Sequence, residues 1–352
     1  MTRIGIAGIG FMGMVHYLTY QRLRGARVAA LCEQDQKRLA GDWRGIQGNF
    51  GPAGKEMDLT GIARYDDLNA MLADESLDAI DITLPPGLHA QIAIKALRAG
   101  KHVFCEKPMA LRPRDCDRMA AAAAKAGRLL MVGHVLPFYP EYAWAYKTVQ
   151  SGKYGRMLGG AFRRVISDPQ WLPHYWSAQR VGGPMLDLHV HDAHFIRLLF
   201  GMPDQVVSVG RMRDDLAQFW HTQFHFANQD YVVEATSGTI DQQGRPFEHG
   251  FEIHLERATL MFDFAVLGST GRMLCQPTLL DDKGRVKHPK LSAGDPMDAF
   301  RAELREILRA IRTGEPSPIL DGALARDAIV ICQKQTESLR KGRPVKIGAK
   351  KQ

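Results

Sequence analysis

Several features are missing from this chain of 352 residues, and each absence excludes a class of protein. No run of about eighteen apolar residues is free of charge, which excludes an ordinary transmembrane helix. We find neither an internal repeat nor a low-complexity tract. Hydrophobic residues make up 45% of the chain and charged residues 24%, so the composition is that of a folded protein and not of a disordered one.

Cysteine is scarce and scattered, with five residues and no CxxC pair. This pattern predicts reduced cysteines in the core and neither a disulfide framework nor a metal site. The first residues run directly into a predicted buried strand, which leaves no room for the regions of a signal peptide. We therefore expect a cytoplasmic protein.

The net charge of +8 is spread along the chain, and the densest basic cluster is a short tail. A mildly basic, solvated surface explains this better than a nucleic-acid or membrane interface, so the expected partner is a small molecule. The length exceeds what one core usually supports, which favours two domains. We place the boundary between residues 1–137 and 138–352.

The first half alternates buried apolar runs with helical patterns, as βαβ units do. Such continuous apolar strands are typical of a parallel sheet covered on both faces. Predicted strands are Arg3–Ala7, Val28–Cys32, Ala79–Thr83, His102–Cys105 and Leu129–Val132, and predicted helices are Met12–Leu23, Asp66–Leu72, His89–Ala99 and Arg114–Ala124. The glycine-rich segment Gly41–Gly61 interrupts the rhythm, and we interpret it as a surface insertion.

After Pro137 the pattern changes to long, partly alternating segments, which predict an antiparallel or mixed sheet. Predicted strands are Met157–Ser167, Gln205–Met212, Phe219–Phe226, Tyr231–Ile240, Phe251–Leu255 and Thr259–Phe264. Predicted helices are Glu141–Ser151, Pro184–Phe200, Met297–Arg312 and Gly322–Lys341.

A GxGxxG motif, GIGFMG, follows the first strand and opens the first helix. In this context Gly8 permits a tight turn, Gly10 lets the backbone approach a pyrophosphate, and Gly13 allows close helix packing. The helix N-terminus then faces the phosphates. Glu33 ends the second strand about 20 positions later, where a carboxylate binds the adenosine ribose and repels the 2′-phosphate of NADP. The sequence therefore predicts NAD and makes NADP the less favoured cofactor, although Lys37 and Arg38 lie one helical turn later and could serve a phosphate.

Further motifs carry a resemblance to a known family. The segment DITLPPGLH (81–89), the tripeptide EKP (106–108) and the segment GGPMLDLHVHD (182–192) follow GIGFMG and Glu33 in one order along nearly the whole chain. In this respect the chain resembles the Gfo/Idh/MocA oxidoreductases, whose namesakes are glucose-fructose oxidoreductase and inositol dehydrogenase. The implied fold is α/β, with an N-terminal Rossmann domain, a doubly wound parallel sheet, and a C-terminal α+β domain with a large open, mostly antiparallel sheet.

The resemblance implies that EKP lies at the nicotinamide end of the cleft, often with a cis bond before the proline, and that Lys107 is catalytic. It also matches the family's catalytic Asp and His to Asp187 and His191. Helical spacing places Asp187, His191 and His194 on one face, while the role of Asp192 stays open. The family's open sheet usually lies in a subunit interface, which implies a homodimer or homotetramer.

The expected reaction moves a hydride between a secondary alcohol of a sugar, sugar derivative or cyclitol and the nicotinamide. His191 is suited to take the hydroxyl proton, Lys107 to relay it or to hydrogen-bond the alkoxide, and Asp187 to orient one of them. The expected cofactor contacts are Gly8, Gly10, Phe11, Met12, Gly13, Glu33, Arg38, Thr83, Leu84, Pro85, His89, Glu106, Lys107 and His134. The expected substrate contacts are Lys107, Arg163, Trp171, Tyr175, Asp187 and His191. Of these, Trp171 and Tyr175 belong to an aromatic stretch that begins at Asp168.

Three alternatives remain. A metal hydrolase could use Asp187, His191 and His194, with His189 completing an HxH, although the dinucleotide motif needs no metal. A sensor of NAD or sugar could share the fold without catalysis. A redox-neutral enzyme could oxidise and re-reduce its substrate on tightly bound NAD. Pro137 stands where relatives commonly carry an arginine, so the substrate's identity stays open.

Overall fold

The computed structural model describes residues 1–48, 50–172, 174–227, 229–291 and 295–348. The chain forms two compact units, each built from two segments: Met1–Tyr139 with Ala293–Arg326, and Pro140–Ser292 with Asp327–Gln352. The first unit is discontinuous because a helix near the C-terminus, α9 (Pro296–Thr313), packs against the first helix and the first strand. A division of the chain near residue 137 alone therefore leaves out α9, which belongs to the first unit.

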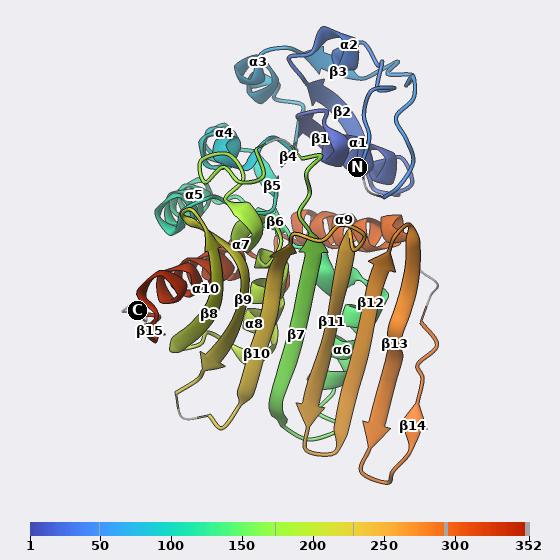
Figure 1. The fold of residues 1–352 in the computed structure, drawn as a ribbon. Coiled ribbons are helices and arrows are strands. Elements are labelled where there is room, and N and C mark those ends of the chain that lie inside the picture. The colour runs from blue at the N-terminus through green and yellow to red at the C-terminus, as the bar shows by residue number, and fades with distance from the viewer. Residues whose placement is uncertain (49, 173, 228, 292–294, 349–352) are drawn as a thin grey trace. The chain divides into compact units, whose positions relative to one another are not determined.

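A six-stranded parallel sheet forms the centre of the first unit, in the order β3-β2-β1-β4-β5-β6 (Figure 1). The predicted apolar runs form its buried strands, and order reverses between β1 and β4, which is the switch point where open α/β sheets bind ligands. The strands are β1 (Thr2–Ala7), β2 (Ala26–Cys32), β3 (Ala63–Tyr65), β4 (Ala79–Ile82), β5 (His102–Glu106) and β6 (Leu130–Gly133).

Helices with one apolar stripe pack on this sheet. In the main core, Ile4 and Ile6 of β1 and Leu31 of β2 are packed with Leu304 and Ile307 of α9. This burial supplies the driving force that holds α9 on the first unit. The other helices here are α1 (Phe11–Tyr20), α2 (Gln36–Leu39), α3 (Leu68–Ala73), α4 (Pro86–Arg98), α5 (Pro113–Ala126) and the 3₁₀ turn η1 (Leu136–Phe138).

The glycine-rich segment 41–61 is not the simple surface insertion that we expected. Trp43 and Ile46 are buried in the main core. The Trp43 indole donates to the Arg38 carbonyl at 2.8 Å and packs edge-on against Tyr17, with ring centroids 4.9 Å apart. Two buried apolar side chains thus anchor the segment on α1. The sequence did not predict this, because the apolar residues of the segment follow neither a helical nor a strand period.

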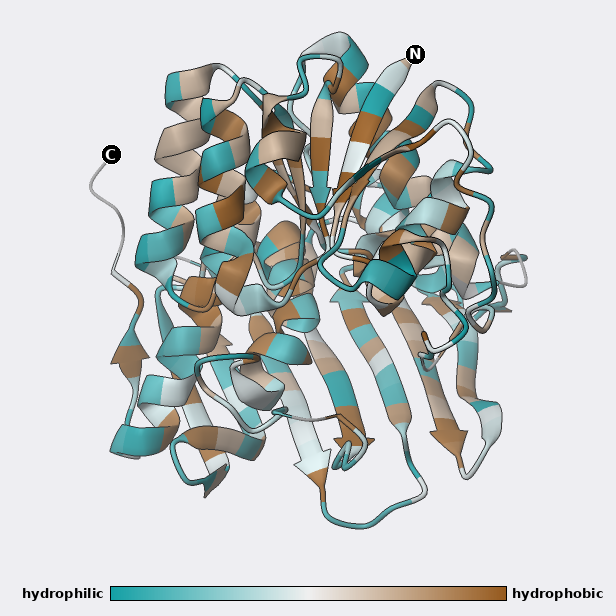
Figure 2. Cartoon of the chain, turned by 90° about the horizontal axis from the view of Figure 1, so that it is seen from above, coloured by the Kyte–Doolittle hydropathy of each residue, from teal (hydrophilic) through white to brown (hydrophobic). Residues whose placement is uncertain are grey.

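The second unit contains a nine-stranded sheet in the order β14-β13-β12-β11-β7-β10-β9-β8-β15. Only β7 and β10 pair in parallel, so the sheet is mostly antiparallel, as predicted. Teal and brown residues alternate along its strands (Figure 2). The strands are β7 (Met157–Ser167), β8 (Gln205–Arg213), β9 (Leu216–His225), β10 (Val232–Ile240), β11 (Phe247–Leu255), β12 (Ala258–Leu267), β13 (Thr270–Asp281), β14 (Val286–Lys287) and β15 (Val345–Lys346).

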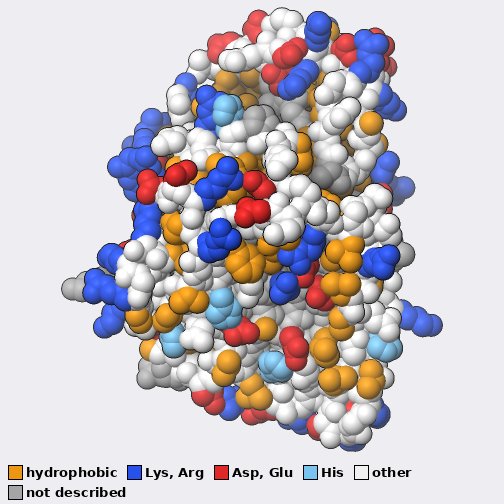
Figure 3. Space-filling view, viewed as in Figure 1, with side chains coloured by type: hydrophobic (Ala, Val, Ile, Leu, Met, Phe, Trp, Pro, Cys, Tyr) orange, Lys and Arg blue, Asp and Glu red, His pale blue; other side chains and the backbone are white. Residues whose placement is uncertain are grey.

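Helices cover one face of this sheet: α6 (Pro140–Gln150), α8 (Val190–Phe200) and most of α10 (Gly322–Lys341). Tyr142 of α6 packs against Phe251 and Phe262, and the Gln335 amide of α10 donates to Thr222 at 2.9 Å. The other face, seen in Figure 3, mixes imidazole, carboxylate and apolar side chains. Among the described residues, no helix combines the length and the apolar character needed to cross a membrane.

Sequence patterns missed the edge strands and misjudged one helix. The sequence did not predict strands β3, β13, β14 and β15. Strands β3, β14 and β15 have only two or three residues, too few to show alternating hydrophobicity, and β13 is largely exposed on both faces. The predicted helix Pro184–Phe200 is two helices, α7 (Gly183–Asp187) and α8. The N–H groups of Leu188 and His189 both donate to the Pro184 carbonyl, which widens the turn and ends α7.

Candidate active site and cofactor cradle

The glycine loop between β1 and α1 is shaped for a ligand that needs a bare backbone. Gly8 has φ +99°, which L side chains rarely adopt. A Cβ on Gly13 would stand 2.1 Å from the Gly8 carbonyl oxygen, so this position has no room for a side chain. Around Gly10, by contrast, no atom of the described residues lies within 4 Å of where a Cβ would be. The loop is therefore closed behind Gly8 and Gly13 and open in front of Gly10.

The N-terminus of α1 opens onto this loop. Its N-cap is Gly10, which has no side chain to satisfy the first N–H groups, and the first helical bond runs from Met14 N–H to Gly10 C=O at 3.0 Å. The N–H groups of Phe11, Met12 and Gly13 precede that bond, so the helix end offers donors and a partial positive charge. A pyrophosphate fits such a site.

Glu33 and Arg38 bind the backbone N–H and C=O groups of the same loop residue, Ile9. The Glu33 carboxylate accepts from Ile9 N–H at 2.7 Å and, with its other oxygen, from the N–H groups of Gln34 and Asp35. The Arg38 guanidinium donates to the Ile9 carbonyl at 3.3 Å. A carboxylate has about four acceptor positions, so Glu33 retains capacity for a ribose hydroxyl.

Thr83 and Leu84, both predicted cofactor contacts, support the loop in this structure. The Thr83 hydroxyl donates to the Gly8 carbonyl at 2.7 Å. The Leu84 side chain lies 3.0 Å from the position of a Cβ on Gly8, and Pro85 is the N-cap of α4. These residues fix the loop's shape through β4, the neighbour of β1 in the sheet.

The EKP turn follows β5 and is held from both sides. The Glu106 carboxylate accepts from Lys107 N–H at 3.0 Å, and the Lys107–Pro108 bond is cis, as the resemblance implied. His89 of α4, fully buried, lies 2.9 Å from the Pro108 carbonyl and 2.7 Å from the Leu84 carbonyl. Burial lowers the pKa of His89, so a neutral imidazole braces the EKP turn against the β4–α4 loop.

His134 lies at the end of β6, next in the sheet to the strand that leads into EKP. Its side chain is fully buried. The preceding residue, Gly133, packs against Glu106, because a Cβ there would stand 2.7 Å from a Glu106 carboxylate oxygen. His134 thus lies at the same edge of the sheet as the EKP turn, and its contact with the cofactor stays a prediction.

In the second unit, the predicted catalytic pair lies at a junction between helices. Asp187 is the last residue of α7, and His191 is the second residue of α8. Because α7 ends at Asp187 and α8 begins at Val190, the predicted face through Asp187, His191 and His194 is not part of one continuous helix. His191 and His194 still share one face of α8, with His194 fully buried.

His189 and Asp192 do structural work that the sequence did not reveal. The His189 ring lies 2.7 Å from Ser237 Oγ of β10 and 3.1 Å from Gln335 of α10. Asp192 accepts two hydrogen bonds from Arg164 of β7, at 2.6 and 3.1 Å, and both side chains are buried. These contacts fasten α8 to the sheet, and the imidazole of His189 is therefore directed away from any shared HxH metal site. Among the described residues, no cluster of three or more metal-ligating side chains could hold an ion.

Arg163 does not join the groups on α8. Side chains alternate across a strand, and since Arg164 faces α8, Arg163 faces the opposite side of the sheet. There its guanidinium pairs with Glu248, whose other oxygen lies 2.6 Å from Arg245. The role of Arg163 as a substrate contact stays a prediction, and its side chain lies on the face of the sheet opposite Arg164.

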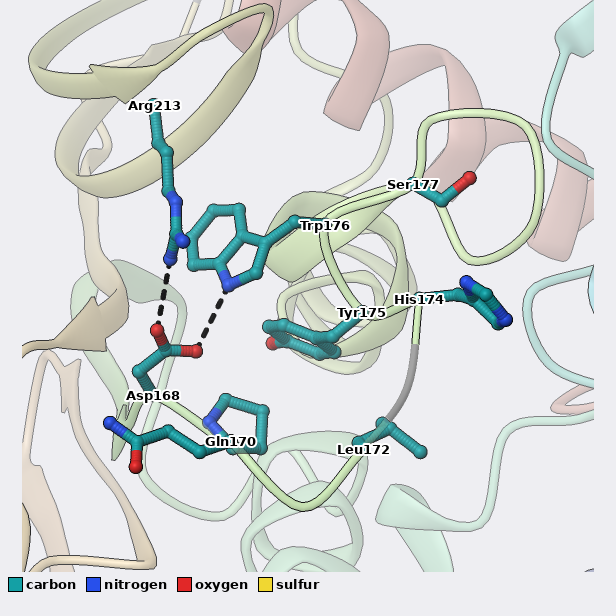
Figure 4. Close-up of a pocket in the computed structure, with 9 residues that line it drawn as sticks. Asp168, Gln170, Leu172, His174, Tyr175, Trp176, Ser177 and Arg213 are labelled. Atoms are coloured by element: carbon teal, nitrogen blue, oxygen red, sulfur yellow. Dashed lines mark hydrogen bonds and ion pairs between the residues drawn. The ribbon is translucent and has the colours of Figure 1, made fainter.

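The aromatic stretch after β7 lines a cavity of about 540 Å³ (Figure 4). The Asp168 carboxylate joins two of its walls, accepting from the Trp176 indole at 3.0 Å and from Arg213 at 2.9 Å. The Arg213 guanidinium also lies 4.4 Å from the centre of the Trp176 ring. Arg213 comes from β8, far along the chain, and no sequence pattern indicated it.

Tyr175 and Trp171 differ in this region. Tyr175 is 2% exposed and its hydroxyl oxygen is buried, while Trp171 is 67% exposed. Burial raises the pKa of Tyr175, and the carboxylates of Asp187 and Asp168 add to this. The predicted substrate residues Tyr175 and Asp187 are therefore close enough to interact, whereas Trp171 is available to solvent.

Comparison with known proteins agrees with this geometry. Residues 2–134 match the oxidoreductase family with an NAD-binding Rossmann fold, and residues 142–261 match the Gfo/Idh/MocA C-terminal domain. The chain is 34% identical to the uncharacterized oxidoreductase ORF334 of Rhizobium meliloti over 74% of this chain and 77% of that protein. It is 25% identical to the myo-inositol 2-dehydrogenase of Thermotoga maritima over 98% of each chain.

Two further similarities bear on function. The chain is 27% identical to the 2,7-anhydro-N-acetylneuraminate hydratase of Mediterraneibacter gnavus over 80% of this chain and 83% of that protein. A levoglucosan dehydrogenase solved with NADH and levoglucosan superposes with a TM-score of 0.79 at 23% identity, over 99% of this chain and 100% of the other. With a matching domain in each half, this chain belongs to the Gfo/Idh/MocA family of oxidoreductases, and its first domain is an NAD-binding Rossmann domain.

Proposed function

We propose that this protein is an NAD-dependent dehydrogenase that oxidises a secondary alcohol of a sugar, sugar derivative or cyclitol. The observation that carries the proposal is the glycine loop, open only in front of Gly10, at the end of a sheet whose β5 leads into the EKP turn. When bound, NAD supplies the hydride acceptor. The relatives named for myo-inositol and levoglucosan support a cyclic, hydroxyl-rich substrate.

The preference for NAD over NADP rests on Glu33. Its carboxylate lies against Ile9 of the glycine loop, where a ribose 2′-phosphate would meet a second negative charge. Arg38 is engaged with the Ile9 carbonyl beside it. We expect NADH to bind at least tenfold more tightly than NADPH, and Glu33→Gln to reduce that ratio.

Three side chains are proposed to handle the proton. His191 accepts it from the substrate hydroxyl, because an imidazole can be a base near neutral pH. Lys107 donates a hydrogen bond to the oxygen as it becomes an alkoxide. Asp187 orients its partner, and Tyr175 and Trp171 complete the substrate contacts. The brace that His89 and Glu106 make around the EKP turn supports a fixed position for Lys107.

A redox-neutral reaction is the second candidate, and one observation favours it. A relative of similar length is a hydratase by name, which indicates that a chain of this kind can catalyse a reaction without net hydride transfer. Such an enzyme would show no net change in free NADH. A sensor on the same fold and a homodimer or homotetramer through the open sheet face remain further proposals for this chain.

The first test of catalysis uses Lys107→Ala with Lys125→Ala as its control, since Lys125 is exposed on α5. Purified protein is mixed with NAD and a panel of sugars, sugar acids and inositols, and NADH absorbance is followed. We expect Lys107→Ala to lose a factor of about 100 or more in kcat/KM and Lys125→Ala to keep wild-type turnover. Full activity in Lys107→Ala would contradict the assigned role.

The second test isolates the cofactor cradle. Gly10→Ala introduces a methyl group where the structure leaves space, so the melting temperature should stay close to wild type while NADH affinity falls at least tenfold. Gly45→Ala is the matched control, because its Cβ also has open space but lies away from the loop. Unchanged NADH titrations for Gly10→Ala would show that the pyrophosphate binds elsewhere.

A further inference from the structure

A cluster of ionisable side chains lies buried beneath the EKP turn. His16 of α1, Asp81 of β4, Glu106 of β5 and Glu303 of α9 are 0, 1, 6 and 0% exposed. Four elements of the first unit thus each contribute one ionisable group to the same interior region. Asp81 and Glu106 belong to motifs already discussed, DITLPPGLH and EKP, whereas His16 and Glu303 do not.

The contacts within the cluster lead to Lys107. His16 Nδ1 lies 3.0 and 3.1 Å from the two oxygens of Asp81, and His16 Nε2 lies 3.2 Å from one oxygen of Glu106. The other Glu106 oxygen accepts from Lys107 N–H. The imidazole therefore bridges two carboxylates, and the second of them holds the backbone of the proposed catalytic lysine.

Glu303 has no comparable partner. Neither of its carboxyl oxygens makes a hydrogen bond to another described residue, although both are buried. The rings of Phe104 and Phe300 flank His16, with centroids 5.4 and 6.2 Å away, so the surroundings are largely apolar. Other ionisable groups that interact with the cluster include Tyr20 of α1, His89 of α4 and Cys105 of β5.

Counting charges gives an excess of acid. The cluster holds three carboxyl groups and one imidazole, so full ionisation would leave a net charge of two negative units on these four buried side chains. Carboxylates that share a buried site cannot all ionise, and one of them retains its proton. Asp81 and Glu106 each have an oxygen within 3.2 Å of a His16 ring nitrogen, whereas Glu303 has no hydrogen-bond donor among the described residues.

We propose that Glu303 is a neutral carboxylic acid in the native protein and that it acts as a positioning residue for Lys107. The neutral side chain fills the space beside His16 and adds no third negative charge to repel Glu106. The Glu106 carboxylate then stays between His16 and Lys107 N–H and fixes the EKP turn. The effect on turnover rests on the proposed dehydrogenase function, but the protonation of Glu303 does not.

Electrostatic tendencies agree with this arrangement. Burial raises the pKa of Glu303 well above its usual value, and Glu106 adds to the effect. Burial by itself lowers the pKa of His16, but the carboxylates of Asp81 and Glu106 outweigh it and raise the pKa. The two shifts correspond to a protonated carboxyl beside an imidazolium.

Protonation is tested without any substrate, by infrared spectroscopy and by melting. Glu303→Gln replaces the neutral acid with a neutral amide of the same shape, and Glu306→Gln is the control one turn along α9, where the side chain pairs with Arg309. We expect a buried carboxylic-acid C=O band in the wild type that is absent in Glu303→Gln and present in Glu306→Gln. A wild-type spectrum without that band overturns the proposal.

The pH dependence of the melting temperature tests whether Glu303 is neutral in the native protein. A carboxyl whose pKa is raised on folding loses stability as pH rises above its unfolded value of about 4.3. The melting temperature of Glu303→Gln relative to wild type should therefore rise by a few degrees between about pH 5 and pH 8. A relative melting temperature that stays constant or falls means that Glu303 is ionised or irrelevant, and overturns the proposal.

Positioning is tested by adding Glu303→Ala. The amide exchange of Lys107 should be unchanged in Glu303→Gln and at least tenfold faster in Glu303→Ala. With an active substrate, Glu303→Ala should lower kcat at least tenfold with NADH affinity within twofold of wild type, and Glu303→Gln should restore kcat. Unaltered Lys107 exchange in Glu303→Ala contradicts the positioning role. If the wild type turns over no substrate while the exchange data hold, the proposed function fails and this inference stands.

Discussion

Buried histidines of this protein have pKa values that are shifted in opposite directions, according to the charges beside them. In the first unit, His16 is surrounded by carboxyl groups that raise its pKa despite burial. In the second, burial lowers the pKa of His189 to about 4, and burial together with the charge of Arg164 lowers the pKa of His249. The comparison teaches that burial alone does not decide protonation, because the sign of the nearest charges determines whether an imidazolium is stable.

The two units also differ in how their buried charges are balanced. Arg164 and Asp192 in the second unit form a closed pair with two hydrogen bonds, so one cation meets one anion. The cluster around His16 has more acids than bases and reaches the EKP turn. We interpret the first as an anchor for α8 and the second as support for a functional turn.

The largest expected effect comes from breaking the buried ion pair between Arg164 and Asp192. Arg164→Met leaves the Asp192 carboxylate buried and without its countercharge, and we expect a loss of about 3–5 kcal/mol in the free energy of unfolding. Urea denaturation measures this directly.

The matched control for that experiment is Arg156→Met. Arg156 is about half exposed and pairs with Asp230 and Glu256 at 2.7 and 3.1 Å. We expect a much smaller loss than for Arg164→Met, because exposed pairs are screened by water. Equal losses at the two positions would remove the distinction between anchor and surface pair.

A smaller effect separates the histidines by pH. Because the pKa of His189 falls on folding, its neutral form is favoured in the native state, and the associated stability is present above about pH 6.5 and is lost as pH falls toward about 4. His189→Gln removes this titration, and we expect its stability to fall less steeply than that of the wild type over that interval, by about 3 kcal/mol in all. Parallel curves of unfolding free energy against pH would show that His189 does not titrate in this range.

The smallest expected effect concerns the aromatic cavity. Trp171→Ala should change the free energy of unfolding by less than about 0.5 kcal/mol, since the side chain is 67% exposed. Trp176→Phe should cost about 1 kcal/mol, because it removes the indole that donates to Asp168. If Trp171→Ala were the more destabilising of the two, the side chain would have a packing role that the structure does not show. A higher KM for Trp171→Ala would support its proposed substrate contact.

The sequence predicted local motifs but not contacts between residues that lie far apart in the chain. Gly8, Gly10 and Gly13 announce a phosphate-binding turn because their tasks depend on a few neighbouring residues. Asp81 and Glu303 both interact with His16, although they lie more than two hundred residues apart in the chain. Neither segment contains a pattern that predicts the other.

The helix that carries Asp187 and His191 shows the same limit. Periodicity predicts a continuous helix, but His189 is held by Ser237 and Gln335, and the turn at Pro184 widens accordingly. The sequence could not place Arg163 for a related reason, since a strand's alternation says which residues share a face but not which face meets α8. Tertiary contacts decided both cases.

The return of α9 to the first unit has a consequence for biosynthesis. A ribosome that has released only Met1–Tyr139 has made every strand of the parallel sheet, yet Leu304 and Ile307, which pack in its main core, have still to be synthesised. During translation the dinucleotide-binding half therefore waits, with apolar surface uncovered, until most of the other half has emerged. Chaperones would meet this nascent chain at its first domain, and a gene fragment cut after Tyr139 should yield an aggregation-prone product.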